Sequence, residues 1–174
     1  MSGLGSFEVI SNQCGSTGEF KSSGWVTSIP ETQEVFTTIS VMPSVAYFRI
    51  MGRCQNLNSG AENNYNIIVT DTGQAWFEKF VAAAGTTISA IGGGAAVYQV
   101  ADGISLAMRG AAPTNLEAWR YRAGAWSILD STTDSSVAGG GVIGLQSGGE
   151  SAVRLDDFGG GEARGTATAF WLRA

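Results

Sequence analysis

The chain has 174 residues with 25 glycines and no histidine, a length that suits one domain able to bury a core without a disulfide or a metal. The net charge is −5 and charged residues make up only 14% of the chain, so a basic surface for nucleic acid or for an anionic membrane is excluded. Without histidine, catalytic triads and metal sites built on imidazole are excluded as well.

Short runs of β-branched and aromatic residues, separated by turn residues, follow one another along the chain. They predict strands at Phe7–Ile10, Trp25–Ile29, Glu34–Met42, Ala46–Arg53, Tyr65–Thr70, Ala75–Ala82, Thr87–Ile91, Ile104–Arg109, Leu116–Arg122, Trp126–Leu129, Val142–Gln146, Ala152–Phe158 and Thr166–Leu172. Within Leu116–Arg122 the side chains alternate, so that Glu117, Trp119 and Tyr121 share one face of the strand.

Turn residues predict two hairpins, at Asp71-Thr72-Gly73 and at Ala123-Gly124. The stretch Trp76–Ala84 is compatible with a helix, but its β-branched and aromatic content and its flanking turns favour a strand. The many short strands indicate an all-β fold. We expect a two-sheet antiparallel jelly-roll sandwich, because one flat sheet would leave a face and two edges open.

Cys14 and Cys54 are too few for a zinc site of four thiolates. We expect two buried thiols, with a single disulfide as the alternative. No run is long and apolar enough to span a membrane, and the N-terminus lacks the basic and apolar regions of a signal peptide. Neither a linker nor an internal repeat divides the chain, so a single domain over 1–174 is expected.

The C-terminal half contains a recognisable order of motifs. Leu116–Arg120 and Trp126–Leu129 precede Asp134-Ser135-Ser136, then Gly141–Leu145, and finally a strand with Leu155-Asp156-Asp157-Phe158. This order resembles the concanavalin A-like lectin/glucanase superfamily, in particular its laminin-G-like modules. The resemblance implies a jelly roll over about 20–160, with a short N-terminal extension and a C-terminal one at 161–174. It leaves the function open, because such modules include sugar binders, protein binders, enzymes and spacers.

Two groups of side chains are candidates for ligand binding. Tyr121 and Trp126 lie beside the Gly124 turn, and Asn63, Asn64 and Tyr65 form an amide-rich segment with an aromatic ring. Core packing is the alternative for the aromatic residues, and turn formation is the alternative for the asparagines. The glucanase branch uses paired carboxylates two positions apart on one strand, and no such run is present. We therefore expect no enzyme, and keep a glucanase-type glycoside hydrolase as a further alternative.

Asp156 and Asp157, followed by Gly159–Gly161, are expected to end a strand and turn the chain away. A structural calcium ion at these two carboxylates is the alternative, although Ca²⁺ takes roughly six to eight oxygen ligands and a dipeptide cannot supply them. No other cofactor is expected. Gly139, Gly141 and Gly144 match a nucleotide-binding pattern, but a strand follows where that pattern needs a helix, so a turn is predicted.

Modules of this kind are usually exported, and the absence of an export signal here favours a protein of a virus particle, such as a bacteriophage. We expect a decoration protein on the virion surface, bound to other capsid or tail subunits. The apolar tail with Phe170, Trp171 and Leu172 either completes the sandwich or pairs with another subunit in a homo-oligomer such as a trimer. The alternative function is a carbohydrate-binding module that holds a surface glycan without cleaving it.

Overall fold

The structure is a computed structural model that describes residues 8–10, 13–15, 21–24, 27–57, 59–148 and 152–163, with the backbone alone for the first three ranges. All regular elements in these ranges are β-strands. In chain order they are β1 (Glu8–Ile10), β2 (Gln13–Gly15), β3 (Lys21–Gly24), β4 (Gln33–Val41), β5 (Tyr47–Gln55), β6 (Asn63–Thr70), β7 (Gln74–Val81), β8 (Ala84–Ala96), β9 (Gly103–Arg109), β10 (Thr114–Arg122), β11 (Ala125–Asp134), β12 (Val142–Gly148) and β13 (Arg154–Glu162).

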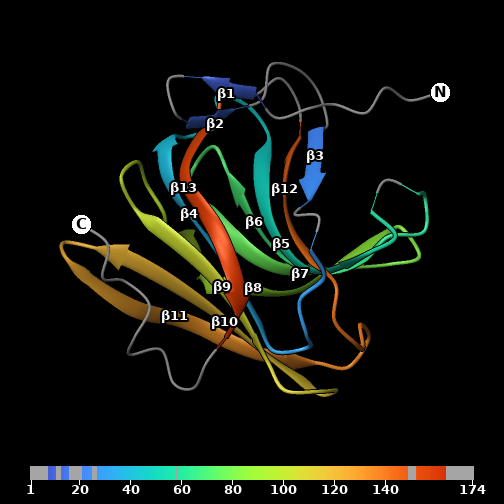
Figure 1. Ribbon diagram of the computed structural model, residues 1–174. Coiled ribbons are helices and arrows are strands. Elements are labelled where there is room, and N and C mark those ends of the chain that lie inside the picture. Colours follow the sequence, from blue (N-terminus) through green and yellow to red (C-terminus); the bar gives the residue numbers. More distant parts are fainter. Residues whose placement is uncertain are drawn as a thin grey trace.

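The strands form two antiparallel sheets that pack face to face (Figure 1). One sheet has seven strands in the order β1-β2-β13-β4-β9-β10-β11, and the other has six in the order β3-β12-β5-β6-β7-β8. Figure 1 shows β13, in red-orange, crossing in front of the molecule beside β4, although the two strands are far apart in the sequence. The predicted all-β sandwich of two antiparallel sheets is confirmed.

The core lies between the sheets and follows from the alternation of inward and outward side chains, which the burial pattern of β4 shows most clearly. In β4 every second side chain from Gln33 to Ile39 is buried, and those between are partly exposed. Apolar residues from both sheets meet in this way in one cluster, which includes Val35, Ile39, Phe48, Ile50, Tyr65, Ile67, Val69, Phe77, Ile91, Ile104, Leu106, Met108, Leu116, Leu145 and Leu155. The stretch predicted as strand rather than helix, Trp76–Ala84, forms most of β7 and the turn after it.

Both predicted hairpins are confirmed. Ala123 and Gly124 connect β10 to β11, and both have positive φ angles, 54° and 84°, as a two-residue turn between twisted strands requires. Asp71-Thr72-Gly73 connects β6 to β7. Gly73 has a φ of 78°, and a Cβ there would lie 2.1 Å from the carbonyl oxygen of Tyr98, so the turn admits only glycine.

The last strand differs from the expectation that Asp156, Asp157 and the glycines end it. β13 continues to Glu162, and Gly159–Gly161 pair with β4. The chain makes a β-bulge between Asp156 and Gly159, with Asp157 at a φ of 52°. Glycine suits the strand beyond the bulge because a Cβ on Gly159 would lie 2.6 Å from Cζ of Phe36. The sheets accordingly extend past both ends of the expected 20–160 range.

The predicted strand at Trp25–Ile29 is not formed over residues 27–29, where Ile29 makes only an isolated bridge with Gly141. β3 lies earlier, at Lys21–Gly24, and Trp25 and Val26 lie outside the described residues. The predicted strand at Thr166–Leu172 lies outside the described residues. Within the described ranges, no helix has the length and apolar character needed to cross a membrane.

Cys54 is a free thiol in the interior of β5, with 4% of its surface exposed. This position agrees with the expected buried thiol and not with the alternative of a disulfide. Burial raises the pKa of the Cys54 thiol to about 12, because the thiolate would lose its hydration there. The side chain of Cys14 lies outside the described part of the chain.

Candidate functional site

Tyr121 and Trp126 face each other across the β10–β11 hairpin. Their ring centroids are 5.5 Å apart and their planes are inclined by 44°. Tyr121 is 39% exposed and Trp126 is partly exposed, so both rings lie at the surface. Asp157, for which calcium binding is the alternative to a strand-ending role, lines a pocket together with this pair on the outer face of the seven-stranded sheet.

Asn63, Asn64 and Tyr65 lie in β6 of the other sheet and not beside this pair. The expected surface position of Tyr65 is wrong, because alternation along β6 turns its ring into the core, where its hydroxyl donates a hydrogen bond to Asp134 Oδ1 at 2.9 Å. Asn64 is 3% exposed. Asn63 is partly exposed, and its Oδ1 accepts a hydrogen bond from the N–H of Ala82, which is a turn-forming contact.

Asp156 and Asp157 point to different partners. Asp156 Oδ1 accepts a hydrogen bond from the backbone N–H of Asp157 at 2.9 Å, and Asp157 Oδ2 accepts one from Thr38 Oγ1 at 3.3 Å. Among the described residues, no three side chains of the metal-binding types His, Cys, Asp and Glu come together. Asp156 and Asp157 therefore have no third carboxylate near them among the described residues to help hold a calcium ion. Phe170, Trp171 and Leu172, predicted to contact another subunit, lie outside the described residues.

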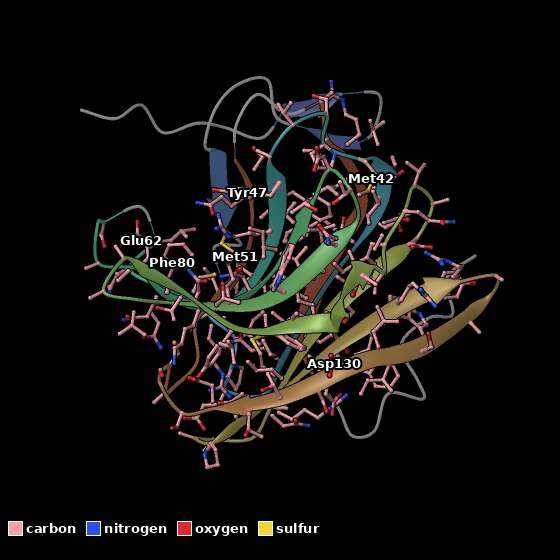
Figure 2. All side chains as sticks on the ribbon, turned by 180° about the vertical axis from the view of Figure 1, so that it is seen from behind. Met42, Tyr47, Met51, Glu62, Phe80 and Asp130 are labelled. Atoms are coloured by element: carbon pink, nitrogen blue, oxygen red, sulfur yellow. The ribbon has the colours of Figure 1, made fainter. Side chains whose placement is uncertain are left out.

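Sequence reasoning missed a polar cluster on the outer face of the six-stranded sheet. Strand register places Gln146, Arg49, Ile68 and Trp76 in one row across β12, β5, β6 and β7, with Met51, Asn66 and Glu78 in the next. We call the outward-pointing side chains of these strands the Arg49 face; they are Tyr47, Arg49, Met51, Asn64, Asn66, Ile68, Trp76, Glu78, Phe80 and Gln146. The labels Tyr47, Met51 and Phe80 mark this region in Figure 2.

Arg49 is held in one orientation at the centre of this face. Its Nε donates a hydrogen bond to Glu78 Oε2 at 3.0 Å, and its Nη1 donates one to Gln146 Oε1 at 2.6 Å. The guanidinium carbon lies 4.1 Å from the ring centroid of Tyr47 and 5.3 Å from that of Phe80. An ion pair, an amide and two aromatic rings thus fix a planar group that has several N–H donors.

Asn66 lies in the next row of this face, opposite Met51 and Glu78, and has an unusual hydrogen-bond state. Its Nδ2 donates to Asn64 Oδ1 at 3.0 Å, whereas its own Oδ1 is buried and has no hydrogen-bond partner in the described structure. Leaving a buried acceptor unpaired costs about 1–3 kcal/mol, so such groups in folded proteins commonly have a water or ligand partner. The residue is 1% exposed and points away from the hydrophobic core.

A signal for this face was present in the sequence. Outward residues recur with period two in three consecutive predicted strands or directly before them, as Tyr47-x-Arg49-x-Met51, Asn64-x-Asn66 and Trp76-x-Glu78-x-Phe80. Each pattern alone is ordinary for a half-exposed strand. Only the pairing of β5 with β6 and of β6 with β7 brings the polar members together.

Two carboxylates share the outer face of the seven-stranded sheet, where Glu34 and Glu117 lie in one row with a single strand between them. Glu117 Oε2 accepts hydrogen bonds from Arg109 Nε at 2.9 Å and Trp119 Nε1 at 3.1 Å, and its Oε1 accepts one from Asn115 Nδ2 at 2.9 Å. Both oxygens are engaged with protein donors. A glycosidase positions two carboxyl groups on either side of the glycosidic bond, whereas here the hydrogen bonds hold Glu117 against its own strand neighbours.

Comparison with solved structures places this architecture among known folds. The chain is similar to a carbohydrate-binding module, CBM66, from Bacillus subtilis, with 17% identity, a TM-score of 0.61, and coverage of 90% of this chain and 91% of that chain. It is also similar to a legume lectin-like domain from Entamoeba histolytica, with 9% identity, a TM-score of 0.59, and coverage of 92% and 89%. The fold is a concanavalin A-like jelly roll. At these identities the likeness shows the fold alone, and it confirms the predicted fold class.

No family model matches the sequence. No curated protein sequence matches it either.

Proposed function

We propose that this protein is a carbohydrate-binding, lectin-like module that holds a glycan on the Arg49 face without cleaving it. The proposal is carried by the fixed guanidinium of Arg49, together with the unpartnered Oδ1 of Asn66 in the neighbouring row of the same face. The two residues supply donors and an acceptor on the outer side of one sheet.

The chemistry of the Arg49 face suits a sugar. Sugar hydroxyls both donate and accept hydrogen bonds, so the hydroxyls of one glycan can pair with an amide acceptor such as that of Asn66 and with the guanidinium N–H groups of Arg49. The apolar C–H surface of a sugar ring packs on an aromatic side chain, and Trp76 is partly exposed in the same row as Arg49. Because Arg49 is already held by Glu78, little side-chain entropy is lost on binding.

The fold is consistent with this proposal. The two solved structures described above are named as a carbohydrate-binding module and as a legume lectin-like domain. A shared fold does not by itself transmit a function, so the Arg49 face has to carry the argument.

Binding without cleavage is supported by the carboxylates. Among the described outward-pointing residues of β5, β6 and β7, Glu78 is the single carboxylate, and it is paired with Arg49. Hydrolysis of a glycosidic bond by the usual route needs two carboxyl groups on either side of the bond. The Arg49 face has one, so it offers a binding surface rather than an acid and base pair.

A glycan array combined with a pull-down on insoluble polysaccharides tests the proposal. We expect the wild-type protein to bind one class of glycan and to release no reducing sugar from it. Glu78→Gln keeps the size of the side chain but removes the charge that holds Arg49, and we expect it to weaken binding about tenfold. Trp76→Ala should weaken binding as well, through loss of a stacking surface. Glu62→Gln, a loop carboxylate outside the Arg49 face, is the matched control and should bind like the wild type.

Circular dichroism on each variant shows whether it is folded before binding is compared. The proposal is wrong if the wild-type protein binds nothing on the array or the polysaccharides, or if Glu78→Gln and Trp76→Ala, both folded, bind as tightly as the wild type. Release of reducing ends would contradict the non-enzymatic part.

The virion context stays a prediction from the sequence. Display on a phage capsid or tail, and a homo-oligomer formed through Phe170, Trp171 and Leu172, involve residues outside the described ranges. Co-sedimentation of the protein with assembled particles tests the first, and analytical ultracentrifugation tests the second.

A further inference from the structure

A pocket of about 200 Å³ lies on the outer face of the seven-stranded sheet, on the opposite side of the sandwich from the Arg49 face. Side chains or backbone from β4, β9, β10, β11 and β13 line it, namely Phe36, Thr37, Thr38, Gly103, Tyr121, Trp126 and Asp157. β4 and β13 are far apart in the sequence, and their pairing in the sheet brings their residues to one pocket.

The floor and one wall of the pocket follow from strand register. Thr38, Gly103, Tyr121 and Trp126 occupy one row across β4, β9, β10 and β11. Gly103 has no side chain, and a Cβ there would lie 2.9 Å from Cβ of Tyr121 and 3.2 Å from Cη2 of Trp126. The indole of Trp126 therefore packs against the backbone of Gly103. The two aromatic rings form one wall of the pocket, and the backbone of Gly103 forms part of its floor.

The other wall contains the carboxylate of Asp157. The bulge in β13 gives this residue a φ of 52°, a conformation that is costly for a residue with a side chain and that recurs at binding and catalytic sites. Thr38 Oγ1 donates a hydrogen bond to Asp157 Oδ2 at 3.3 Å, which orients the carboxylate. None of the ion pairs among the described residues includes Asp157, so its charge is free to meet a ligand.

We propose that this pocket is a second ligand site, which takes a single neutral or amino sugar residue with adjacent free hydroxyl groups. The ring of such a sugar packs its C–H face on Trp126 and Tyr121. Two adjacent hydroxyls donate to the carboxylate of Asp157, which accepts through both oxygens.

Size and charge narrow the class of ligand. Pockets for larger organic ligands usually measure roughly 300–1,000 Å³, so a pocket of about 200 Å³ suits one ring rather than an oligosaccharide buried along its length. A uronic acid would place a second negative charge next to Asp157 and should be rejected. An ammonium group on the ring would be attracted to it.

Two sites on opposite faces would give one protein two glycan contacts. Because the two sites face away from each other, they would bind two separate glycan chains and connect them through the protein. This consequence depends on the glycan binding proposed for the Arg49 face, but the pocket itself does not.

Titration of the ¹⁵N-labelled protein with methyl glycosides tests the pocket directly. The probes are the methyl glycosides of glucose, galactose, mannose, fucose and N-acetylglucosamine, together with glucosamine and methyl glucuronide. The indole N–H resonance of Trp126, assigned by its loss in Trp126→Phe, reports on the pocket, and that of Trp76 reports on the Arg49 face. We expect at least one neutral or amino sugar to shift the Trp126 resonance and methyl glucuronide to leave it unchanged.

Variants separate the two sites. Asp157→Asn removes the charge, and asparagine tolerates a positive φ, so the bulge is kept and we expect affinity at the pocket to fall at least tenfold. Trp126→Ala should abolish the binding. Ile128→Ala, on the same strand and 49% exposed but outside the pocket, is the matched control and should leave it unchanged. Glu78→Gln should also leave the Trp126 shift unchanged, because it lies on the other sheet.

The inference is overturned if no probe shifts the Trp126 resonance, if methyl glucuronide binds as well as the neutral sugars, or if Asp157→Asn binds with wild-type affinity. Shifts confined to Trp76 would support the proposed function of the Arg49 face and refute the second site. Shifts confined to Trp126 would support the second site and would speak against sugar binding on the Arg49 face.

Discussion

Arg49 Nε donates a hydrogen bond to Glu78 Oε2 at 3.0 Å, and this ion pair connects β5 to β7 across the intervening strand β6. The side chains of the two residues are only 9% and 15% exposed, so both charges have lost most of their hydration. Each charge compensates the other for this loss.

Glu78→Gln should therefore destabilise the protein. Removing one partner of a largely buried pair leaves the other charge uncompensated, and we expect the free energy of unfolding to fall by about 1–3 kcal/mol, less than for a fully buried pair because some solvent remains. Urea unfolding followed by intrinsic fluorescence measures the change. Glu62→Gln should change stability by less than about 0.5 kcal/mol. Equal stability of the Glu78→Gln variant and the wild type would show that the pair is not a stabilising contact.

Gly103→Ala should move the aromatic wall of the pocket. The added Cβ would lie 2.9 Å from Cβ of Tyr121 and 3.2 Å from Cη2 of Trp126, so the two aromatic residues must shift, at a cost of about 1–3 kcal/mol. Near-UV circular dichroism and thermal unfolding measure this. Gly161→Ala is the control, because no atom lies within 4 Å of the position of its Cβ. An unchanged near-UV spectrum in Gly103→Ala would contradict the packing of the indole against this glycine.

Acid should weaken the fold through Asp134. Burial alone would raise the pKa of Asp134, but hydrogen bonds from Lys79, Ser136 and Tyr65 outweigh it and lower this pKa to about 2. A carboxylate whose pKa is lower in the folded than in the unfolded state stabilises the fold above pH 4, and the contribution is lost as the pH falls from about 4 to 2.

We expect this loss to amount to about 1–2 kcal/mol, measured as the difference in urea unfolding between pH 7 and pH 2.5. Asp134→Asn should be less stable than the wild type at pH 7 and should show a smaller pH dependence in this window. Asp71→Asn, at an exposed turn, is the control and should keep the wild-type dependence. A wild-type profile in Asp134→Asn would mean that other carboxylates cause the acid sensitivity.

Cys54 should be unreactive in the folded protein. Burial excludes reagents and raises the pKa of the thiol to about 12, so almost no thiolate is present at pH 8. In a Cys14→Ser background, iodoacetamide at pH 8 should modify Cys54 only after addition of denaturant, as followed by intact-protein mass spectrometry. Rapid modification of the native protein would show that β5 opens or that the thiol is accessible.

Much of the fold could be predicted from local patterns. The hairpin at Ala123-Gly124 and the alternating faces of Leu116–Arg122 depend on residues a few positions apart, and both are confirmed. The exposed pair of Tyr121 and Trp126 follows from the same hairpin. By contrast, the inward turn of Tyr65 was not predicted, since an aromatic ring next to two asparagines resembles a surface loop as well as a core strand.

Arg53 shows why other parts could not be predicted. Its side chain is fully buried, and its guanidinium donates hydrogen bonds to Thr114 Oγ1 and to the carbonyl oxygens of Val137, Gly110 and Glu31. These acceptors come from three separate parts of the chain, namely Glu31, the segment from Gly110 to Thr114, and Val137. Nothing in the residues next to Arg53 indicates that they are within reach, and a charged residue is expected at the surface.

The sequence by itself determined the classes of partner that composition excludes, the period-two strands, and the tight turns, because these depend on residue type and on neighbours along the chain. Only the tertiary structure decided that Arg49, Asn66 and Glu78 share one face, and that Asp157 and Trp126 line one pocket. Both arrangements are set by strand register and by a bulge, which are chosen by the packing of the whole sandwich and not by any local segment.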